Sequence, residues 1–351
     1  GKPPEAPSKG VCQRTGCEAT VLTEKRIKEI VSRFSMAAWR AKEAGFDGVE
    51  LQFGLGYLVA QFLSPRTNQR TDRYGGDDEK RMRFAEEVFA AVRNSVGDAF
   101  PISVRISASE KVPGGLDVED GIQLSKKLER WGVDLIHVVT GSNCESVPWY
   151  FQHMALPARV NETLAAQIKK EVNVPVMAAG RLGDPQRIRE VLEAGMVDMV
   201  AIGRGLIADP DLPKKMLENR DSEVLRCGHC LQGCFAHVLS GVGIGCNINP
   251  EVGHETEPVT AAAVSKRGAV VGGGPAGIQA AMTASRRGHK VTLFEKRERL
   301  GGQFELAFVP PSKQRMEQPF RSLVAQVTRS GVEIRLGEEA TREKVEAVRP
   351  D

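Results

Sequence analysis

The sequence has no long apolar run and no block of one charge. No stretch reaches the roughly 20 apolar residues that a transmembrane helix needs. The opening residues, GKPPEAPSKG, lack the charged and apolar regions of a signal peptide. Basic and acidic residues are mixed along the chain, with a formal net charge of +3. These absences argue against a membrane protein and a nucleic-acid-binding protein, and a cytoplasmic location follows by default.

The chain also lacks an initial Met and opens on a Pro-rich stretch. We therefore expect it to be the interior of a longer protein, truncated at both ends. Its 351 residues are enough for one large α/β barrel or for two or three ordinary domains, each with a real core.

Helical and strand patterns alternate through the first part of the chain. The predicted helices span residues 23–45, 79–97, 118–132, 161–172 and 184–195. The predicted strands span residues 47–53, 101–107, 134–141, 174–180 and 197–205. Such alternation predicts a parallel sheet, either doubly wound or part of a (β/α)8 barrel.

Polar residues and glycines at the strand ends distinguish these two folds. They are Gln52, Arg105, Thr140 with Gly141, Gly180 with Arg181, and Gly203 with Arg204. Strand C-terminal ends form the catalytic face of a TIM barrel, whose last two strands commonly lead into a phosphate site. A glycine lets the backbone approach the anion, and an arginine supplies paired charged donors. The pattern therefore favours part of a TIM barrel.

Four of the seven cysteines lie in the stretch CGHCLQGCFAHVLSGVGIGC, as Cys227, Cys230, Cys234 and Cys246. Clustered cysteines in a reducing compartment are more often metal ligands or redox groups than structural disulfides. Structural zinc usually takes two C-x2-C pairs, and only the first pair here has that spacing. Three close cysteines with a fourth further on match a cubane 4Fe-4S cluster. The spacing favours iron and sulfur over zinc or disulfides.

A different pattern begins at residue 268 with GAVVGGGPAGIQAAMTASRRGHKVTLFEK. A strand runs into Gly272, Gly274 and Gly277, a helix follows, and a second strand ends at Glu295. This is the fingerprint of a dinucleotide-binding fold. The glycines let a pyrophosphate lie against the helix N-terminus, and the carboxylate binds a ribose hydroxyl.

The order of barrel, cysteine segment and dinucleotide fold resembles the multidomain branch of the Old Yellow Enzyme family, in particular its 2,4-dienoyl-CoA reductases. The matching stretches include AGFDGVELQFGLGYLVAQFLSPRTNQRTDRYGGDDEKRMRFAEEV, PISVRIS, the AGR and IGRG loops, CNINP, and GGGPAG through GGQF. The resemblance implies an α/β chain in three parts: about strands 4–8 of an FMN-binding TIM barrel (1–220), an iron-sulfur segment (221–262), and the first βαβ portion of a Rossmann-like FAD/NAD(P)-binding domain (263–351).

The resemblance also implies four cofactors: FMN, FAD, a 4Fe-4S cluster and NAD(P)H. The residues implied to contact FMN are Arg105 at the ring and Gly180, Arg181, Gly203 and Arg204 at the phosphate. Those implied to contact FAD are Gly272, Gly274, Gly277, Glu295, Gly302 and Gln303. NAD(P)H electrons would pass from FAD through the cluster to FMN, because a one-electron cluster needs a flavin on each side.

Tyr57, in the GYL motif, matches the tyrosine that serves as proton donor in the reductase branch. A phenol is a plausible general acid for the carbon left carbanionic after hydride addition. Gln52 stands at the substrate-binding position of the family, and Leu55 replaces the second polar residue there. Arg66 is a candidate contact for an acidic substrate, or else a structural ion pair.

The catalytic histidine of the family is expected after the third predicted strand. His153 is the only histidine there, although the surrounding residues do not align well, so Glu145 and Tyr150 compete for its role. Cys12, Cys17 and Cys144 make no motif. We expect Cys144 to be a small buried residue, and a disulfide involving Cys12 and Cys17 only outside the cytosol.

These residues predict an NAD(P)H-dependent flavin and iron-sulfur oxidoreductase that reduces an activated alkene, such as an enoyl-CoA, a 2,4-dienoyl-CoA, an enoate or an enone. The altered Gln52 and Leu55 leave an amine dehydrogenase or N-demethylase of the trimethylamine dehydrogenase type open. The apparent truncation leaves a non-catalytic electron-transfer subunit open. The expected partner is a small unsaturated molecule, with a CoA thioester among the candidates, and formation of a homo-oligomer is left undecided.

Overall fold

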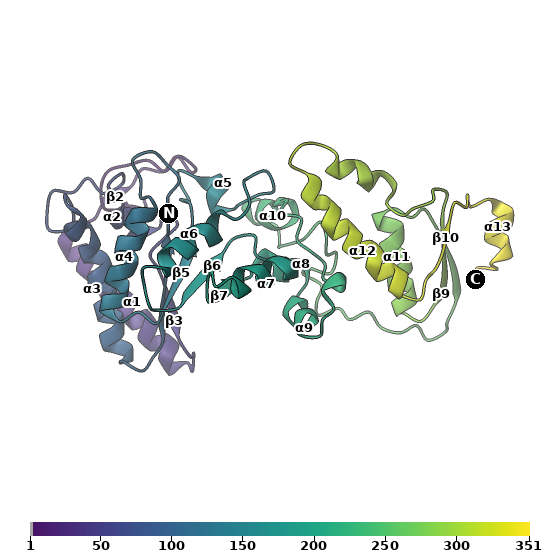
Figure 1. Ribbon diagram of the computed structural model, residues 1–351, viewed down its shortest axis with the longest axis horizontal. Coiled ribbons are helices and arrows are strands. Elements are labelled where there is room, and N and C mark those ends of the chain that lie inside the picture. The colour runs from purple at the N-terminus through teal and green to yellow at the C-terminus, as the bar shows by residue number, and fades with distance from the viewer. Residues whose placement is uncertain (1–2) are drawn as a thin grey trace. The chain divides into compact units, whose positions relative to one another are not determined.

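The computed structural model describes residues 3–351, which form two compact units (Figure 1). The first unit comprises residues 3–182 and 187–202, and the second comprises residues 183–186 and 203–351. Within residues 3–351, no helix combines the length and the apolar character that crossing a membrane requires. The predicted three-part division at residues 220 and 262 stays a prediction.

The first unit is built on a parallel sheet of five strands in the order β3-β4-β5-β6-β7. The strands are β3 (Val49–Gln52), β4 (Ile102–Ser107), β5 (Leu135–Val139), β6 (Val176–Ala179) and β7 (Met199–Ala201). Each strand pairs with its neighbour in sequence, as in a barrel wall. The predicted α/β fold with a parallel sheet is confirmed. In the register, Gln52 lies opposite Arg105, which lies opposite His137.

Helices follow the strands of the first unit in the predicted alternation. They are α1 (Glu24–Glu43), α2 (Leu58–Leu63), α3 (Asp78–Val96), α4 (Val118–Trp131), α5 (Val147–Tyr150), α6 (Val160–Lys169) and α7 (Pro185–Glu193). Side chains cap the long ones: Thr23 accepts a hydrogen bond from the Arg26 amide, Asp77 accepts one from Lys80, and Asp117 forms a capping box. Such caps satisfy amides that would otherwise lack partners at the helix start.

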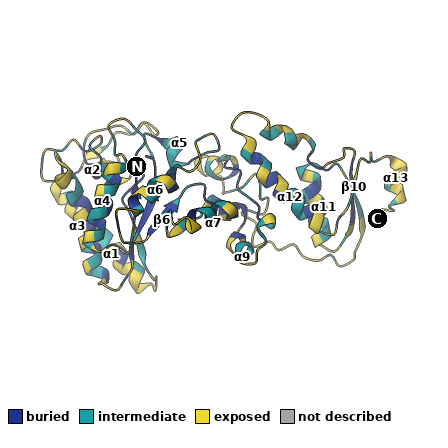
Figure 2. Cartoon of the chain, in the orientation of Figure 1, coloured by how far each residue is buried: buried dark blue, intermediate teal, exposed yellow. Residues whose placement is uncertain are grey.

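The core of the first unit lies between the sheet and these helices. Alternate strand residues such as Val104, Ile106, Ile136 and Val138 are fully buried against apolar faces of the helices. Figure 2 shows the buried residues of this unit gathered in the sheet and on the inner faces of the helices. The remaining strand residues point to the opposite face of the sheet, where the polar residues predicted from the sequence lie.

Ahead of α1, the chain forms two short strands and a narrow turn. The strands β1 (Glu5–Ala6) and β2 (Thr20–Val21) pair in parallel. Between them, Val11 and Glu18 form an antiparallel bridge, so that residues 11–18 make a small hairpin.

The predicted strand over residues 197–205 is shorter in the structure than in the prediction. Strand β7 ends at Ala201, Gly203 is the N-cap of a short helix α8 (Arg204–Ala208), and Arg204 is its first residue. The residues assigned to the strand beyond Ala201 turn the chain into α8, and such a boundary depends on cap geometry rather than on apolar periodicity.

The second unit contains a parallel sheet in the order β10-β9-β8. Its strands are β8 (Arg267–Val271), β9 (Lys290–Glu295) and β10 (Glu333–Leu336), with helices α11 (Pro275–Arg286), α12 (Glu317–Arg329) and α13 (Arg342–Ala347) and short helices η3 (Gly302–Phe308) and η4 (Gln314–Met316). The predicted strand–helix–strand unit is β8–α11–β9. A second core packs Ile278, Leu293, Phe320 and Val327 together.

Residues 203–266 of the second unit have little regular structure. They contain α8, α9 (Leu212–Leu217), η1 (Asp221–Glu223), the π-helical turn η2 (Gln232–Ala236) and α10 (His237–Leu239). Among the described residues, none of this stretch belongs to either hydrophobic core cluster. We call residues 227–246 the cysteine segment.

Candidate active site and cofactor sites

Polar side chains meet on the inner face of the first sheet. Arg105 Nε of β4 lies 3.1 Å from His137 Nδ1 of β5 and 3.1 Å from Glu50 Oε1 of β3. Glu50 Oε2 is 2.8 Å from His137 Nδ1. Burial disfavours the charged carboxylate, but the hydrogen bond and charge of His137 and the charge of Arg105 outweigh it and lower the pKa of Glu50. Arg105 is thus held in an ion pair, and its contact with a flavin stays a prediction.

Tyr57 lies on the loop between β3 and α2, with its side chain exposed. Its hydroxyl oxygen is 2.7 Å from that of Tyr150, at the end of α5, and the two rings pack in a T-shaped arrangement with centroids 6.3 Å apart. Burial and the hydrogen bond to Tyr57 raise the pKa of Tyr150 to about 12. The shift therefore makes the Tyr150 phenol a weaker acid than an ordinary tyrosine, which is itself protonated at neutral pH.

The backbone before Tyr57 is held in left-handed conformations. Leu55 has φ 61° and Gly56 has φ 73°. For Leu55 this costs roughly 1–2 kcal/mol. Its side chain is buried, its amide donates to Ser107 Oγ at 2.7 Å, and its carbonyl accepts a hydrogen bond from the Asn143 amide at 2.9 Å. A side chain at position 56 would clash with that of Ser142. The tyrosine loop is thus fixed against the segment that carries Tyr150.

His153 lies in the turn after α5. Its carbonyl accepts a hydrogen bond from Arg181 Nη1 at 3.1 Å, and its Nδ1 accepts one from the Ala155 amide at 3.3 Å. The hydroxyl of Tyr57 is hydrogen-bonded to Tyr150 instead. A catalytic role for His153 stays a prediction, while Tyr150, its competitor in the sequence, is in contact with Tyr57.

Arg66 forms an ion pair in the structure. Its Nε donates to both carboxylate oxygens of Glu145, at 2.8 and 2.9 Å, and its Nη1 donates to the Pro113 carbonyl at 3.2 Å. The Arg66 side chain is 37% exposed. Gln52, the other residue predicted to bind substrate, turns its Oε1 to the Gly54 amide at 3.1 Å. Substrate contacts of both residues stay predictions.

The two loops predicted to hold the FMN phosphate lie in different units and are described separately. Gly180 has φ 132° and Arg181 has φ 58°, and Arg181 Nη1 donates to the carbonyls of His153 and Leu156. Arg204 begins α8, and its Nη1 is buried with no hydrogen-bond partner within the described chain. A side chain at Gly203 would meet open space. A buried guanidinium nitrogen without an acceptor beside an open glycine fits an anionic phosphate.

The four cysteines of the cysteine segment are free thiols of intermediate burial. The His229 amide points to Cys227 Sγ at 3.4 Å, and the Ile248 amide points to Cys246 Sγ at 3.4 Å, the same i to i+2 pattern at both ends. Amide donors of this kind stabilise sulfur ligands of iron-sulfur clusters. Burial raises the pKa of Cys227 to about 11, opposed by the His229 amide and the charge of Arg204.

The backbone of the cysteine segment is bent tightly. His229 and Leu231 are both left-handed, with φ 54° and 62°. A side chain at position 233 would lie 2.8 Å from Cys246 Cα, so only a glycine fits there. The described residues contain no group of three or more His, Cys, Asp or Glu side chains placed to hold a metal ion. The donor set fits iron and sulfur in its chemistry, and the cluster itself stays a prediction.

The glycine turn of the second unit has the geometry of a dinucleotide cradle. Gly272 has φ 100°, a side chain at position 277 would collide with the Gly272 carbonyl, and Gly274 caps α11 with open space where its side chain would be. A missing side chain at Gly274 lets a pyrophosphate reach the N-terminus of this 12-residue helix. The turn therefore fits a dinucleotide.

Glu295, at the end of β9, lies beside this turn. It is buried, and its two oxygens accept hydrogen bonds from the Gly273 amide at 2.8 Å and the Arg297 amide at 2.9 Å. Gly302 packs so closely that a side chain there would lie 3.2 Å from Gly274 Cα, whereas Gln303 is exposed. The flavin contacts of Glu295, Gly302 and Gln303 stay predictions.

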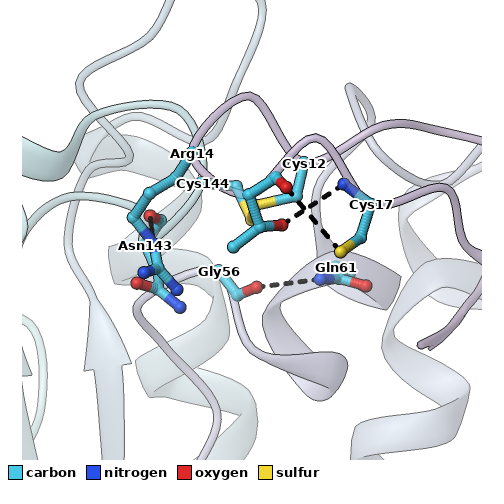
Figure 3. Close-up of a disulfide and its surroundings, with 8 residues drawn as sticks. Cys12, Arg14, Cys17, Gly56, Gln61, Asn143 and Cys144 are labelled. Atoms are coloured by element: carbon cyan, nitrogen blue, oxygen red, sulfur yellow. Dashed lines mark hydrogen bonds between the residues drawn. A yellow bond between two sulfur atoms is a disulfide. The ribbon is translucent and has the colours of Figure 1, made fainter. Parts of the chain in front are cut away.

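The structure contains two features that the sequence did not reveal. The Glu50–His137 pair that holds Arg105 was missed, although period-two alternation along β3 and β5 places both residues on the inner face. Cys12 and Cys144, expected to be unpaired, form a disulfide across 132 residues (Figure 3). Pairing across such a distance has no signature in cysteine spacing.

The chain matches two protein families. The NADH:flavin oxidoreductase / NADH oxidase family matches residues 3–223, and the FAD dependent oxidoreductase family matches residues 269–348. An NADH oxidase from Thermoanaerobacter brockii is 44% identical over 354 aligned residues, covering 100% of this chain and 54% of the relative. The chain spans about half the length of the curated relatives it matches.

Two solved structures resemble the chain along almost its whole length. A 2-naphthoyl-CoA reductase in complex with 2-naphthoyl-CoA is 33% identical with a TM-score of 0.94, covering 99% of this chain and 54% of that one. A histamine dehydrogenase from Rhizobium sp. 4-9 is 29% identical with a TM-score of 0.87, covering 98% of this chain and 51% of that one. The predicted fold, with a TIM-barrel-like flavin domain followed by an FAD domain, is confirmed. The chain belongs to the NADH:flavin oxidoreductase / NADH oxidase family.

Proposed function

We propose that this protein reduces a carbon–carbon double bond conjugated to a carbonyl, with NAD(P)H as the electron source and a CoA thioester or a free acid as the substrate class. The observation that carries the proposal is the pair of phenols formed by Tyr57 and Tyr150, with their oxygens 2.7 Å apart. Reduction of such an alkene adds a hydride at one carbon and a proton at the next, so the site needs a proton donor.

The tyrosine pair suits donation of that proton. Tyr57 is exposed at the strand-end face and is held by the Leu55–Gly56 turn, so its hydroxyl has a fixed position relative to the sheet. Tyr150, like any tyrosine of ordinary or raised pKa, is protonated at neutral pH, and its hydroxyl can pass a proton to Tyr57 after Tyr57 has donated its own. Tyr57 is therefore the proton donor in this proposal, with Tyr150 replenishing it.

The residues of the chain also fit the groups that such an enzyme holds. Arg204 with Gly203 would hold the FMN phosphate, the glycine turn at Gly272–Gly277 would hold FAD, and the four cysteines would hold a 4Fe-4S cluster. When bound, the flavins supply hydride transfer and the cluster supplies one-electron transfer between them. Arg105 would lie at the flavin ring with its charge partly balanced by Glu50.

Two relatives support the proposed substrate class and the proposed electron source. The structural relative with 2-naphthoyl-CoA carries a CoA thioester, and the relative from Thermoanaerobacter brockii is an NADH oxidase. The positive charge of Arg66 would bind an acidic substrate, provided that the substrate displaces Glu145 from it.

A second candidate function is oxidation of an amine. The likeness to a histamine dehydrogenase favours it, as does Leu55, which cannot hydrogen-bond a substrate carbonyl. Amine oxidation would use the phenol pair differently, because the site would then have to accept a proton from the substrate.

The test is a steady-state assay of the anaerobically purified holoprotein. We expect NAD(P)H consumption that depends on an added enoyl-CoA or enoate, with a saturated product. Failure of every unsaturated substrate, together with turnover of a methylated amine, would contradict the reductase. A purified protein that binds no flavin would contradict both enzymatic functions and leave an electron-transfer subunit.

A further inference from the structure

Three cysteines outside the cysteine segment lie close together at the strand-end side of the first unit (Figure 3). Cys12 and Cys144 form a disulfide, with their Cα atoms 5.2 Å apart. Cys17 is a free, exposed thiol on the same small hairpin as Cys12. None of the three takes part in the function proposed above.

Cys12 and Cys17 face each other across the hairpin of residues 11–18. The Cys12 amide donates to the Cys17 carbonyl at 3.1 Å, next to the antiparallel bridge between Val11 and Glu18. Residues directly opposite on antiparallel strands have Cβ atoms about 4.5–5.5 Å apart. A disulfide needs about 3.5–4.5 Å, so a small closure of this exposed turn brings the two sulfurs into bonding range.

The existing disulfide ties the hairpin to the segment that follows β5. Arg14 adds a hydrogen bond from Nε to the Asn143 carbonyl at 3.2 Å, and the Asn143 amide in turn donates to the Leu55 carbonyl at 2.9 Å. Residues 142–150 therefore have two attachments to the hairpin, one covalent and one polar. The same segment carries Glu145 and Tyr150.

We propose that Cys12, Cys17 and Cys144 form a thiol–disulfide exchange site in which Cys12 is shared between two partners. The Cys17 thiolate attacks Cys12 Sγ, a bond forms between the sulfurs of Cys17 and Cys12, and the bond between Cys12 and Cys144 breaks. The electron pair leaves on Cys144 Sγ, which takes up the proton that Cys17 released. One disulfide and one thiol are present before and after, so no external oxidant or reductant is needed.

The exchange changes what the hairpin is attached to. With Cys12 bonded to Cys144, the hairpin is fixed to residues 142–150. With Cys12 bonded to Cys17, the hairpin is closed on itself, and residues 142–150 keep only the Arg14 hydrogen bond to it. Cys144 is then a free thiol six residues before Tyr150.

Trypsin separates the three cysteines and allows each pairing to be identified. Cleavage after Lys9, Arg14 and Lys25 places Cys12 in residues 10–14 and Cys17 in residues 15–25, and cleavage after Arg130 and Arg159 places Cys144 in residues 131–159. The holoprotein is equilibrated at mildly alkaline pH without reductant, its free thiols are blocked with N-ethylmaleimide at acidic pH, and the digest is analysed unreduced by mass spectrometry.

We expect two linked species in the wild type, the 10–14 peptide joined to 131–159 and the same peptide joined to 15–25. Cys17→Ser should leave only the first. In Cys144→Ser the two remaining thiols are treated with oxidised glutathione, a low-molecular-weight disulfide that takes up their two electrons, and should form only the second. Three results would each overturn the proposal: a wild type with the first species alone, a Cys144→Ser variant in which Cys12 and Cys17 stay unlinked after that oxidation, or a link between Cys17 and Cys144. Cys144→Ala, with far-UV circular dichroism, separates a misfolded variant from a failed exchange.

Discussion

The sheet of the first unit and the cysteine segment of the second hold their functional residues by different means. Arg105 and Tyr57 are positioned by strands and loops that pack on a hydrophobic core, with Val104 and Ile106 fully buried beneath Arg105. Within the part of the chain that the structure describes, residues 203–266 supply no side chain to the two core clusters, although Leu212 and Val224 are buried locally, and Val238 and Leu239 of the cysteine segment are exposed.

This difference in core packing indicates which groups are held in place before any cofactor binds. The tyrosine pair and the Arg105 ion pair belong to a folded barrel wall, whereas the four thiols of the cysteine segment would be joined only by the cluster that we propose for them. Where no preformed core exists, the binding free energy of the metal is also folding free energy. The two regions should therefore respond differently to loss of a cofactor.

The largest effect should follow loss of the iron-sulfur group. Cys234→Ser, or anaerobic chelation, should abolish the broad visible absorbance of the cluster and make residues 227–246 sensitive to limited proteolysis. The flavin bands and the far-UV circular dichroism of the barrel should remain. Cys17→Ser, an exposed cysteine outside the segment, is the matched control. Unchanged iron content in Cys234→Ser would refute the assignment of ligands.

The next largest effect should come from the tyrosine pair. Tyr57→Phe should lower kcat for alkene reduction by about 10²–10⁴, because general acid catalysis contributes about that much. Reduction of the flavin by NAD(P)H should be unchanged in a stopped-flow measurement. Tyr150→Phe should lower kcat less, since Tyr57 keeps its own proton.

Tyr74→Phe is the control for this pair. Tyr74 is buried and donates to Glu87 Oε2 at 2.9 Å, away from the tyrosine pair in the hydrogen-bond network. Its loss should cost about 1 kcal/mol of unfolding free energy and leave kcat unchanged. Equal loss of kcat in the Tyr57 and Tyr74 variants would mean that the effect is structural.

Alanine substitutions at two glycines of the nucleotide turn should distinguish an effect on folding from an effect on FAD binding. Gly277→Ala should disrupt the turn even without FAD, because the new methyl group collides with the Gly272 carbonyl. Gly274→Ala should keep the fold, since nothing lies near its side-chain position, yet weaken FAD binding by blocking the helix N-terminus. Thermal unfolding of the apoprotein and flavin titration measure the two effects. A normal FAD affinity in Gly274→Ala would place the dinucleotide elsewhere.

The smallest effect should be a stability change confined to the barrel wall. Glu162, nearly fully buried, accepts from Arg187 Nη2 at 2.8 Å and Nε at 3.1 Å and so joins α6 to α7. Glu162→Gln should lower the unfolding free energy in urea by about 1–3 kcal/mol. Glu190→Gln removes a more exposed partner of the same arginine and should change it by less than about 0.5 kcal/mol. Neither should alter the iron content.

The apolar periodicity of the sequence predicted the helices and strands, because burial of one face of each element dictates that periodicity. The five strands and their helices alternate as expected, and the glycine triplet lies where the strand–helix–strand unit requires. The predicted end of this strand at residue 205 was wrong, because β7 ends at Ala201 and the chain then turns into α8. Boundaries depend on caps and local turns, which an apolar pattern does not record.

The sequence predicted the candidate site less completely, because its contacts join segments far apart in the chain. Tyr57 could be named from its motif, but its contact with Tyr150 depends on how two loops meet 93 residues apart. The disulfide between Cys12 and Cys144 likewise joins two segments that are far apart in the chain. Arg66 could be named as a charged residue near the site, yet only the structure shows that Glu145 neutralises it.

The most direct test of the central claim is an anaerobic single-turnover experiment. The holoprotein, fully reduced with NAD(P)H, is mixed with an enoyl-CoA, and the flavin absorbance and the saturated product are followed together. The account predicts that the flavin bands return as saturated product appears, and that Tyr57→Phe slows both. A protein that stays reduced with every unsaturated substrate, but is reduced from its oxidised state by a methylated amine, would contradict it.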